Sequence, residues 1–166
     1  MTNLGFNCWI FFRSIRIINI IRLIFNAMSH TCSSVLIRCI DFRFTSAIDK
    51  WLEEKGIMDD CDIISVAGIS KAIAEDENSA DAQFILKQIE LSVKLHSTKT
   101  LYLIHHTDCG AYGGHGAFEN LEIETQKYND HMRQAGEIIK SKFPELEIKQ
   151  VLAEIHDDGS INFIEK

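Results

Sequence analysis

The chain has 166 residues, of which 46% are hydrophobic and 25% charged, a composition that suits one globular domain with a substantial core. Its formal net charge is −7, and from Asp41 onward 24 acidic residues stand against 13 basic ones. Because nucleic-acid binding depends on clustered Lys and Arg, this acidic body argues against nucleic acid as a partner.

The first segment, residues 1–27, differs from the rest because it is rich in Ile and Phe and has no acidic residue. Arginines interrupt the apolar run before the roughly 20 residues that a membrane span needs, so no stable span is expected. A small-residue cleavage site, typical of a secretory signal, is not evident. The segment is interpreted as an organelle presequence or interfacial helix, or as sequence upstream of a true start at Met28. The functional domain is assigned to 28–166, in the cytoplasm, or in an organelle matrix if 1–27 is a presequence.

A buried strand is predicted at 34–39, where a short run of β-branched and apolar residues occurs. The helix after it is predicted to begin with Thr45 as the N-cap and to stop at Gly56. A second apolar run at 61–68, ending in glycine, predicts the next strand.

Ser79 is the expected N-cap of a second helix, in which apolar residues recur on one face. The run 99–106 predicts a third strand. A long amphipathic helix should follow a glycine-rich turn and end before Pro144.

The run 146–155 predicts a fourth strand, and the Asp-Gly pair at 158–159 predicts a hairpin into a closing strand at 160–166. Strands that alternate with helices indicate parallel βαβ units. The predicted fold is therefore α/β, with a mostly parallel central sheet of about four strands, an antiparallel edge strand and helices on both faces.

Two polar clusters follow predicted strands, where sites gather in such sheets. Strand alternation should put Cys39, Asp41 and Arg43 on one side. His106 and Cys109, three residues apart across a turn, can converge on one point. One nitrogen and two sulfurs are ligands that zinc prefers, and they leave a fourth position free for water or Asp41. A Cys–His nucleophile pair, with Cys109 or Cys39 as the thiolate, is the alternative that stays open.

The other cysteines and polar residues receive less specific interpretations. An odd cysteine count and wide spacing favour free thiols or a metal over disulfides, and Cys32 and Cys61 are interpreted as plain thiols. His105 should point to the opposite side of its strand and be structural or exposed. Asp108 is expected to face solvent, with the orientation of a backbone amide as the alternative. Further expectations concern His115 as a candidate proton shuttle, Tyr112 at the site mouth, and His131 and His156 at the surface.

The stretches CIDFR (39–43) and HHTDCG (105–110) resemble the C-x-D-x-R and H-x-x-C signatures of the β-class carbonic anhydrases. The resemblance runs through about 35–166. It implies that Zn²⁺ is bound by Cys39, His106 and Cys109. It also implies a catalytic dyad of Asp41 and Arg43, with Gly68 and Gly110 beside the substrate.

The function implied by this resemblance is that of a lyase, a carbonate dehydratase in which zinc-bound hydroxide converts carbon dioxide reversibly to bicarbonate. A homodimer or higher homo-oligomer is also implied. Because two thiolates would leave zinc-bound water only weakly acidified, an activity that rises with pH is expected. The family's RNAG segment keeps only its Ala-Gly here, after Ser65 and Val66. Two alternatives follow: a zinc hydrolase of carbonyl sulfide or carbon disulfide, and a non-catalytic zinc-binding homologue.

Overall fold

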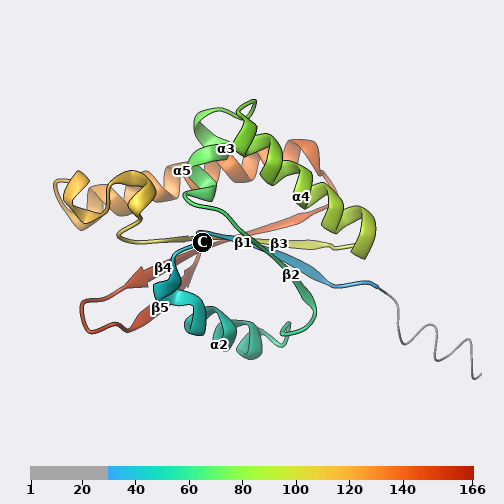
Figure 1. Cartoon of the computed structure of the whole chain (residues 1–166), viewed down its shortest axis with the longest axis horizontal. Coiled ribbons are helices and arrows are strands. Elements are labelled where there is room, and N and C mark those ends of the chain that lie inside the picture. The colour runs from blue at the N-terminus through green and yellow to red at the C-terminus, as the bar shows by residue number, and fades with distance from the viewer. Residues whose placement is uncertain (1–29) are drawn as a thin grey trace, which may run out of the picture. The chain divides into compact units, whose positions relative to one another are not determined.

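The computed structural model describes residues 30–166, so the interpretation of 1–27 lies outside the described residues. One five-stranded sheet runs through this part of the chain in the order β2-β1-β3-β4-β5 (Figure 1). The first four strands pair in parallel, and β5 pairs antiparallel with β4. The strands are β1 (Ser34–Arg38), β2 (Cys61–Ser65), β3 (Thr100–His106), β4 (Glu147–Ile155) and β5 (Ile161–Glu165).

Helices cover both faces of the sheet (Figure 1). Helix α2 (Thr45–Lys55) lies on one face, and α3 (Ile69–Glu75), α4 (Ala80–His96) and α5 (Leu121–Lys142) lie on the other. Three short 3₁₀ helices, η1 (Phe42–Phe44), η2 (Gly110–Tyr112) and η3 (His115–Ala117), connect these elements. The predicted α/β fold class is confirmed. Within residues 30–166, no helix is both long and apolar enough to cross a membrane.

The core lies on the two central strands. Val35, Leu36 and Ile37 of β1 and Leu103 of β3 are completely buried, because helices press on the sheet from both sides. Each such side chain contributes about 1.5–3 kcal/mol through the hydrophobic effect. The core therefore holds β1 and β3 side by side, with Arg38 opposite Ile104, and their carboxyl ends meet at one edge.

The end of β1 corrects one prediction. The strand stops at Arg38, and the chain turns so that the Asp41 side chain caps η1 by accepting a hydrogen bond from the Arg43 amide at 2.9 Å. Alternation along a strand is therefore the wrong account of this segment, although Ile40 and Phe42 do point outward and are 59% and 84% exposed. A turn, not a strand, brings Asp41 and Arg43 together.

The helix caps divide between confirmed and wrong predictions. The Ser79 hydroxyl accepts a hydrogen bond from the Ala82 amide at 3.2 Å, and Gly56 ends α2 in the left-handed conformation, both as predicted. Thr45 is not the N-cap of α2, because η1 leads directly into the helix and Phe44 occupies that position without a side-chain bond.

Helix α3 was not predicted, and the strand expected at 61–68 already ends at Ser65. Gly68 adopts the left-handed conformation, with φ +57°, and starts the seven-residue helix directly after the strand. A helix this short shows few periodic positions in the sequence, so its buried residues Ile69 and Ile73 were insufficient as a signal.

Candidate metal centre

Three predicted ligands meet where β1 and β3 end. Cys39, His106 and Cys109 are buried, and one ligand atom from each lies within 4.8 Å of the other two. The two sulfur atoms are 4.0 Å apart, too far for a disulfide bond. The Cys39 and Cys109 thiols are free, in agreement with the expected reduced cysteines.

His106 has one ring nitrogen turned into this cluster. Its Nδ1 lies 2.8 Å from the Thr107 carbonyl oxygen, which can only accept, so Nδ1 carries the proton. Its Nε2 therefore presents a lone pair, and this buried atom has no hydrogen-bond partner among residues 30–166. Phe44 packs against the ring with a centroid separation of 4.9 Å and fixes its orientation.

The two thiols are not equivalent. A hydrogen bond from the Cys109 thiol lowers the pKa of Cys39 against the opposing effect of burial. The pKa of Cys109 is raised because its proton is held by the Cys39 sulfur and because it is buried. Both sulfurs are ligand atoms that suit a soft or borderline metal ion.

A buried carboxylate supports Cys109 from behind. The Tyr128 hydroxyl accepts a hydrogen bond from the Cys109 amide at 3.3 Å and donates to Glu124 at 2.7 Å. Glu124, only 1% exposed, also accepts from the Asp108 amide at 2.6 Å and contacts His115. Sequence reasoning missed Glu124. Its spacing of four residues from Tyr128, on the buried face of the long helix, was the available signal.

Asp41 is held by Arg43 beside the cluster. The guanidinium donates to both Asp41 carboxylate oxygens, at 2.7–3.1 Å. This ion pair lowers the pKa of Asp41 and raises that of Arg43. The Oδ2 atom of Asp41 lies 4.0 Å from Nε2 of His106, so a small rotation could bring it to the same point as the ligands.

Asp108 completes this ion-pair network and orients a backbone amide, the alternative to the favoured solvent-facing position, while its side chain stays 32% exposed. Arg43 donates to the Asp108 carboxylate at 2.6 Å and to its carbonyl oxygen at 2.9 Å. The other carboxylate oxygen accepts from the His115 amide at 2.8 Å. Asp108 is itself in the left-handed conformation, with φ +56°. Its contacts tie the turn before Cys109 to Arg43.

The two glycines predicted beside the substrate, Gly68 and Gly110, differ in how closely other residues pack against them. A Cβ atom on Gly68 would come within 2.5 Å of the Ala111 Cβ, so the loop after β2 packs tightly against η2. The Gly68 backbone also lies beside Cys39 and helps to lower the pKa of that thiol. Around Gly110, no atom of the described chain lies within 4 Å of such a Cβ. Close approach therefore requires glycine at 68, whereas Gly110 borders open space.

The neighbouring histidines divide between confirmed and wrong predictions. His105 is fully buried away from the cluster, 2.8 Å from the Ser70 hydroxyl, and burial lowers its pKa to about 3, so it is structural as expected. His131 is only 4% exposed and bonds the Tyr112 hydroxyl at 2.8 Å, so its predicted surface position is wrong. His156 is exposed, as predicted.

The donor set fits a zinc ion. Tetrahedral coordination with Zn–S bonds of about 2.3 Å separates two sulfur ligands by roughly 3.8 Å, close to the 4.0 Å observed between Cys39 and Cys109. The unpartnered Nε2 of His106 supplies a third ligand of the right type. The described residues thus offer a nearly preformed S₂N site with a fourth position available to water or to Asp41.

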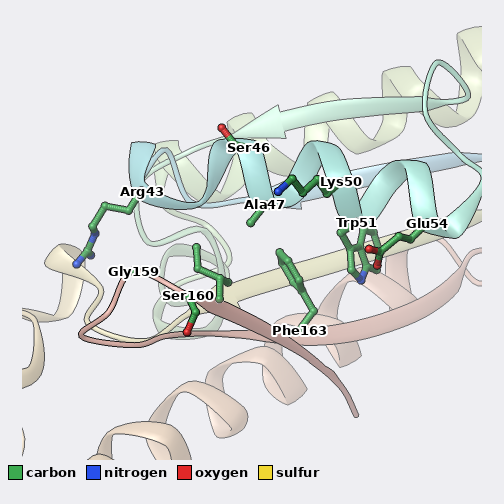
Figure 2. Close-up of a pocket in the computed structure, with 10 residues that line it drawn as sticks. Arg43, Ser46, Ala47, Lys50, Trp51, Glu54, Gly159, Ser160 and Phe163 are labelled. Carbon is green, nitrogen blue, oxygen red and sulfur yellow. The ribbon is translucent and has the colours of Figure 1, made fainter.

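Two hollows flank Arg43. One, of about 420 Å³, is lined by Arg43, Asp108, His115, Ile155, His156, Asp157 and Gly159 and lies beside the candidate centre. The other, of about 380 Å³, is the groove between α2 and the β5 hairpin, with Arg43 at one end and Trp51 and Glu54 at the other (Figure 2). None of the three candidate ligands lines either hollow. The first includes Asp108, which directly precedes the ligand Cys109 in the chain, so it is the better approach to the centre.

Comparison with known proteins bears on the chemistry of this site. Residues 29–164 match a family model described as "Putative carbonic anhydrase". The chain belongs to this carbonic anhydrase family. The recognition made from the CIDFR and HHTDCG stretches is therefore confirmed at the level of the family.

Relatives of this carbonic anhydrase family member occur in Rickettsia. A protein of Rickettsia bellii, named "Uncharacterized protein", is 35% identical over 135 residues, which cover 80% of this chain and 81% of that protein. A similarly named protein of Rickettsia conorii is 34% identical over 119 residues, which cover 70% of this chain and 64% of that one.

Solved structures of β-carbonic anhydrases are also similar to this family member. One, from Sordaria macrospora, is described as tetrameric, is 16% identical, and has a TM-score of 0.45, with 96% of this chain and 94% of that chain covered. Another, from Aspergillus fumigatus, is 14% identical with a TM-score of 0.41, and the match covers 94% of this chain and 85% of that one.

Proposed function

We propose that this protein is a zinc-dependent carbonic anhydrase that converts carbon dioxide and water reversibly to bicarbonate and a proton. The observation that carries the proposal is the convergence of the Cys39 and Cys109 sulfurs with the unpartnered Nε2 of His106. Membership of the carbonic anhydrase family supports the same reaction.

Cys39, His106 and Cys109 would hold the ion. When bound, zinc supplies a Lewis acid that makes water more acidic near neutral pH. The two sulfur ligands balance much of its charge, so this acidification should be weaker than in an all-histidine site. Activity is therefore expected to rise between pH 6 and pH 9.

Asp41 and Arg43 would control access to the fourth position. While Arg43 holds both oxygens of Asp41, the carboxylate is kept from the ligand cluster and can accept a hydrogen bond from a water there. Oδ2 of Asp41 lies 4.0 Å from Nε2 of His106. If the ion pair with Arg43 opens, this oxygen would need only a short movement to occupy the fourth ligand position and close the site. The dyad would thus position water when paired and exclude it when broken.

The released proton must reach solvent. His115 lines the 420 Å³ hollow with a half-exposed side chain and contacts the buried Glu124. An imidazole at the mouth of a site can pass a proton to solvent, so His115 is the proposed shuttle. Gly68 and Gly110 remain the proposed neighbours of the small substrate. Gly110 borders open space, whereas Gly68 would contribute its backbone, because a Cβ there would meet Ala111.

Stopped-flow carbon dioxide hydration on metal-quantified protein tests this function. Cys39→Ser should lose one zinc per chain and at least a hundredfold in hydration rate, because a hydroxyl is a much poorer zinc ligand than a thiolate. Cys61→Ser, which makes the same change in a cysteine of β2, is the matched control and should retain both.

Two results would contradict the proposal. Equal zinc contents in the wild type and Cys39→Ser would show that Cys39 does not bind zinc and would contradict the proposed metal centre. A zinc-loaded protein without hydration activity would favour the carbonyl sulfide or carbon disulfide hydrolase, or the non-catalytic zinc-binding homologue. The homo-oligomer implied by the resemblance and the cytoplasmic location expected from the sequence stay predictions.

A further inference from the structure

A second group of ligand-type side chains lies at the opposite end of the sheet from the candidate centre. Cys32 precedes β1, Asp62 is in β2 and His96 ends α4. One ligand atom from each lies within 4.8 Å of the other two, and all three side chains are partly exposed. These residues come from three separate segments, so the fold alone brings them together.

The backbone fixes this arrangement. The Cys32 amide donates to the His96 carbonyl at 3.0 Å, which joins the start of β1 to the end of α4. Asp62 is held beside Val35 by the parallel pairing of β1 and β2. Ser97, in the left-handed conformation with φ +60°, ends α4 and turns the chain immediately after His96.

The side chains already contact one another. Asp62 Oδ2 lies 2.7 Å from His96 Nδ1, and the Cys32 sulfur is 3.6 Å from the Thr98 hydroxyl. Thr98 is buried and forms a hydrogen bond with the Ser92 hydroxyl at 2.7 Å, so the hydroxyl beside the Cys32 thiol is held in place. The Asp62 and His96 side chains are 29% and 34% exposed, so a small ion can reach them from solvent.

We propose that Cys32, Asp62 and His96 form a second divalent metal site, selective for zinc or a similar borderline ion. One sulfur, one oxygen and one nitrogen are all zinc ligands, and water would complete the tetrahedron. Ligand separations of roughly 3.3–3.8 Å are needed in such a site, so the Asp62–His96 pair would open slightly from 2.7 Å while Cys32 moves closer.

Charge and protons balance at this site. The Cys32 thiol releases its proton on binding, and the resulting thiolate and the Asp62 carboxylate together neutralise a divalent cation. The metal takes the place of the proton at Nδ1 of His96, and the neutral imidazole then carries its proton on Nε2. The carbonyl end of α4 adds a favourable partial negative charge. The bound ion would clamp β1, β2 and α4 together.

Cys61 is a neighbouring thiol outside this group. Its sulfur points to the Asp62 carbonyl oxygen at 3.4 Å, and it packs against the core. Burial raises the pKa of Cys61 to about 11, so it remains a thiol. The same substitution at Cys61 and at Cys32 therefore separates a metal ligand from a nearby cysteine.

Zinc binding to the full chain under reducing conditions, read by equilibrium dialysis and elemental analysis, tests the proposal. Cys32→Ser, Asp62→Asn and His96→Gln should each bind one zinc per chain fewer than the wild type, whereas Cys61→Ser should match it. Thermal unfolding gives a second readout: the rise in Tm on adding zinc should be smaller in His96→Gln than in the wild type.

The zinc lost in these variants is independent of the carbonic anhydrase centre. Cys39→Ser should remove a different equivalent, so the double variant Cys39→Ser/His96→Gln should bind two zinc ions fewer than the wild type. Equal zinc contents in the wild type, Asp62→Asn and His96→Gln would overturn the second site. A loss in Cys61→Ser that Cys32→Ser does not reproduce would also overturn it.

Discussion

At the scale of single residues, the candidate centre depends on charged groups that are fully paired. Arg43 forms hydrogen bonds with both Asp41 and Asp108. Glu124 forms hydrogen bonds with the Asp108 amide, the Tyr128 hydroxyl and the His115 ring. A carboxylate as buried as Glu124 is tolerated because backbone and side-chain donors replace the water it loses. These contacts orient the turn that carries Cys109, so their effect on the metal is indirect.

Asp108 gives a pH-dependent test of this network. Hydrogen bonds from the His115 amide and from Arg43 lower its pKa. A depressed carboxyl pKa stabilises the fold above its unfolded value of about 4, and this stabilisation disappears as the pH falls through the folded value. Asp108→Asn should therefore lower the free energy of unfolding by about 1 kcal/mol at pH 7 and by much less at pH 3.

Urea denaturation of the metal-free protein at both pH values measures this difference. Asp157→Asn is the control, because Asp157 lines the same hollow but accepts no hydrogen bond within the described part of the chain. If Asp108→Asn lowers the free energy of unfolding equally at pH 7 and pH 3, Asp108 stabilises the fold through its shape and not through its charge.

At the scale of elements, the candidate centre is assembled from loops after strands. The turn after β1 brings Cys39, the turn after β3 brings Cys109, and the loop after β2 places Gly68 against both Cys39 and η2. Helix α3 starts at that loop and anchors it through its buried residues Ile69 and Ile73. The tight packing at Gly68 thus connects an unpredicted helix to the metal ligands.

Gly68→Ala tests this packing. The substitution adds left-handed backbone strain of about 1 kcal/mol and a clash with Ala111 of about 2 kcal/mol, so unfolding free energy should fall by about 3 kcal/mol. Gly56→Ala is the matched control, since its φ of +69° is similar but no atom of the described chain lies within 4 Å of the new Cβ. It should lose only about 1 kcal/mol. Equal losses in denaturant midpoints would mean that Ala111 moves aside without cost.

At the scale of the whole molecule, the two ends of the sheet carry two groups of metal-ligand side chains. Cys39, His106 and Cys109 lie at the carboxyl ends of the parallel strands, and Cys32, Asp62 and His96 lie at the other end. The hydrophobic core between them involves only residues of 34–163 among those described. We propose, as the domain division made from the sequence implies, that 28–166 is sufficient for folding and metal binding.

A protein that starts at Met28 tests this division. It should unfold in one cooperative transition and bind as much zinc per chain as the full chain, because the core and both groups of ligands are retained. Light scattering on the same samples measures the expected homo-oligomer. A loss of cooperative unfolding on removal of 1–27 would show that the domain extends into that segment.

Local sequence signals were sufficient for much of the fold. Apolar runs, the Asp-Gly hairpin signal and helical periods predicted all five strands and three of the four α-helices within residues 30–166, because these elements are long enough to show their pattern. Helix α3 was missed since it has only seven residues. The turn at Asp41 was missed because an Asx-type cap and a strand end look alike in sequence.

The sequence by itself determined the ligand types and the family. Cys39, His106 and Cys109 follow predicted parallel strands, and such strands end at one edge, so their convergence could be inferred without coordinates. Only the tertiary structure decided which charges are paired and which ligand-type residues meet. The contacts of Asp108, Glu124 and His131, and the meeting of Cys32, Asp62 and His96, join segments far apart in the chain. Such pairings depend on how helices pack on the sheet, and local sequence patterns do not specify which distant residues this packing brings together.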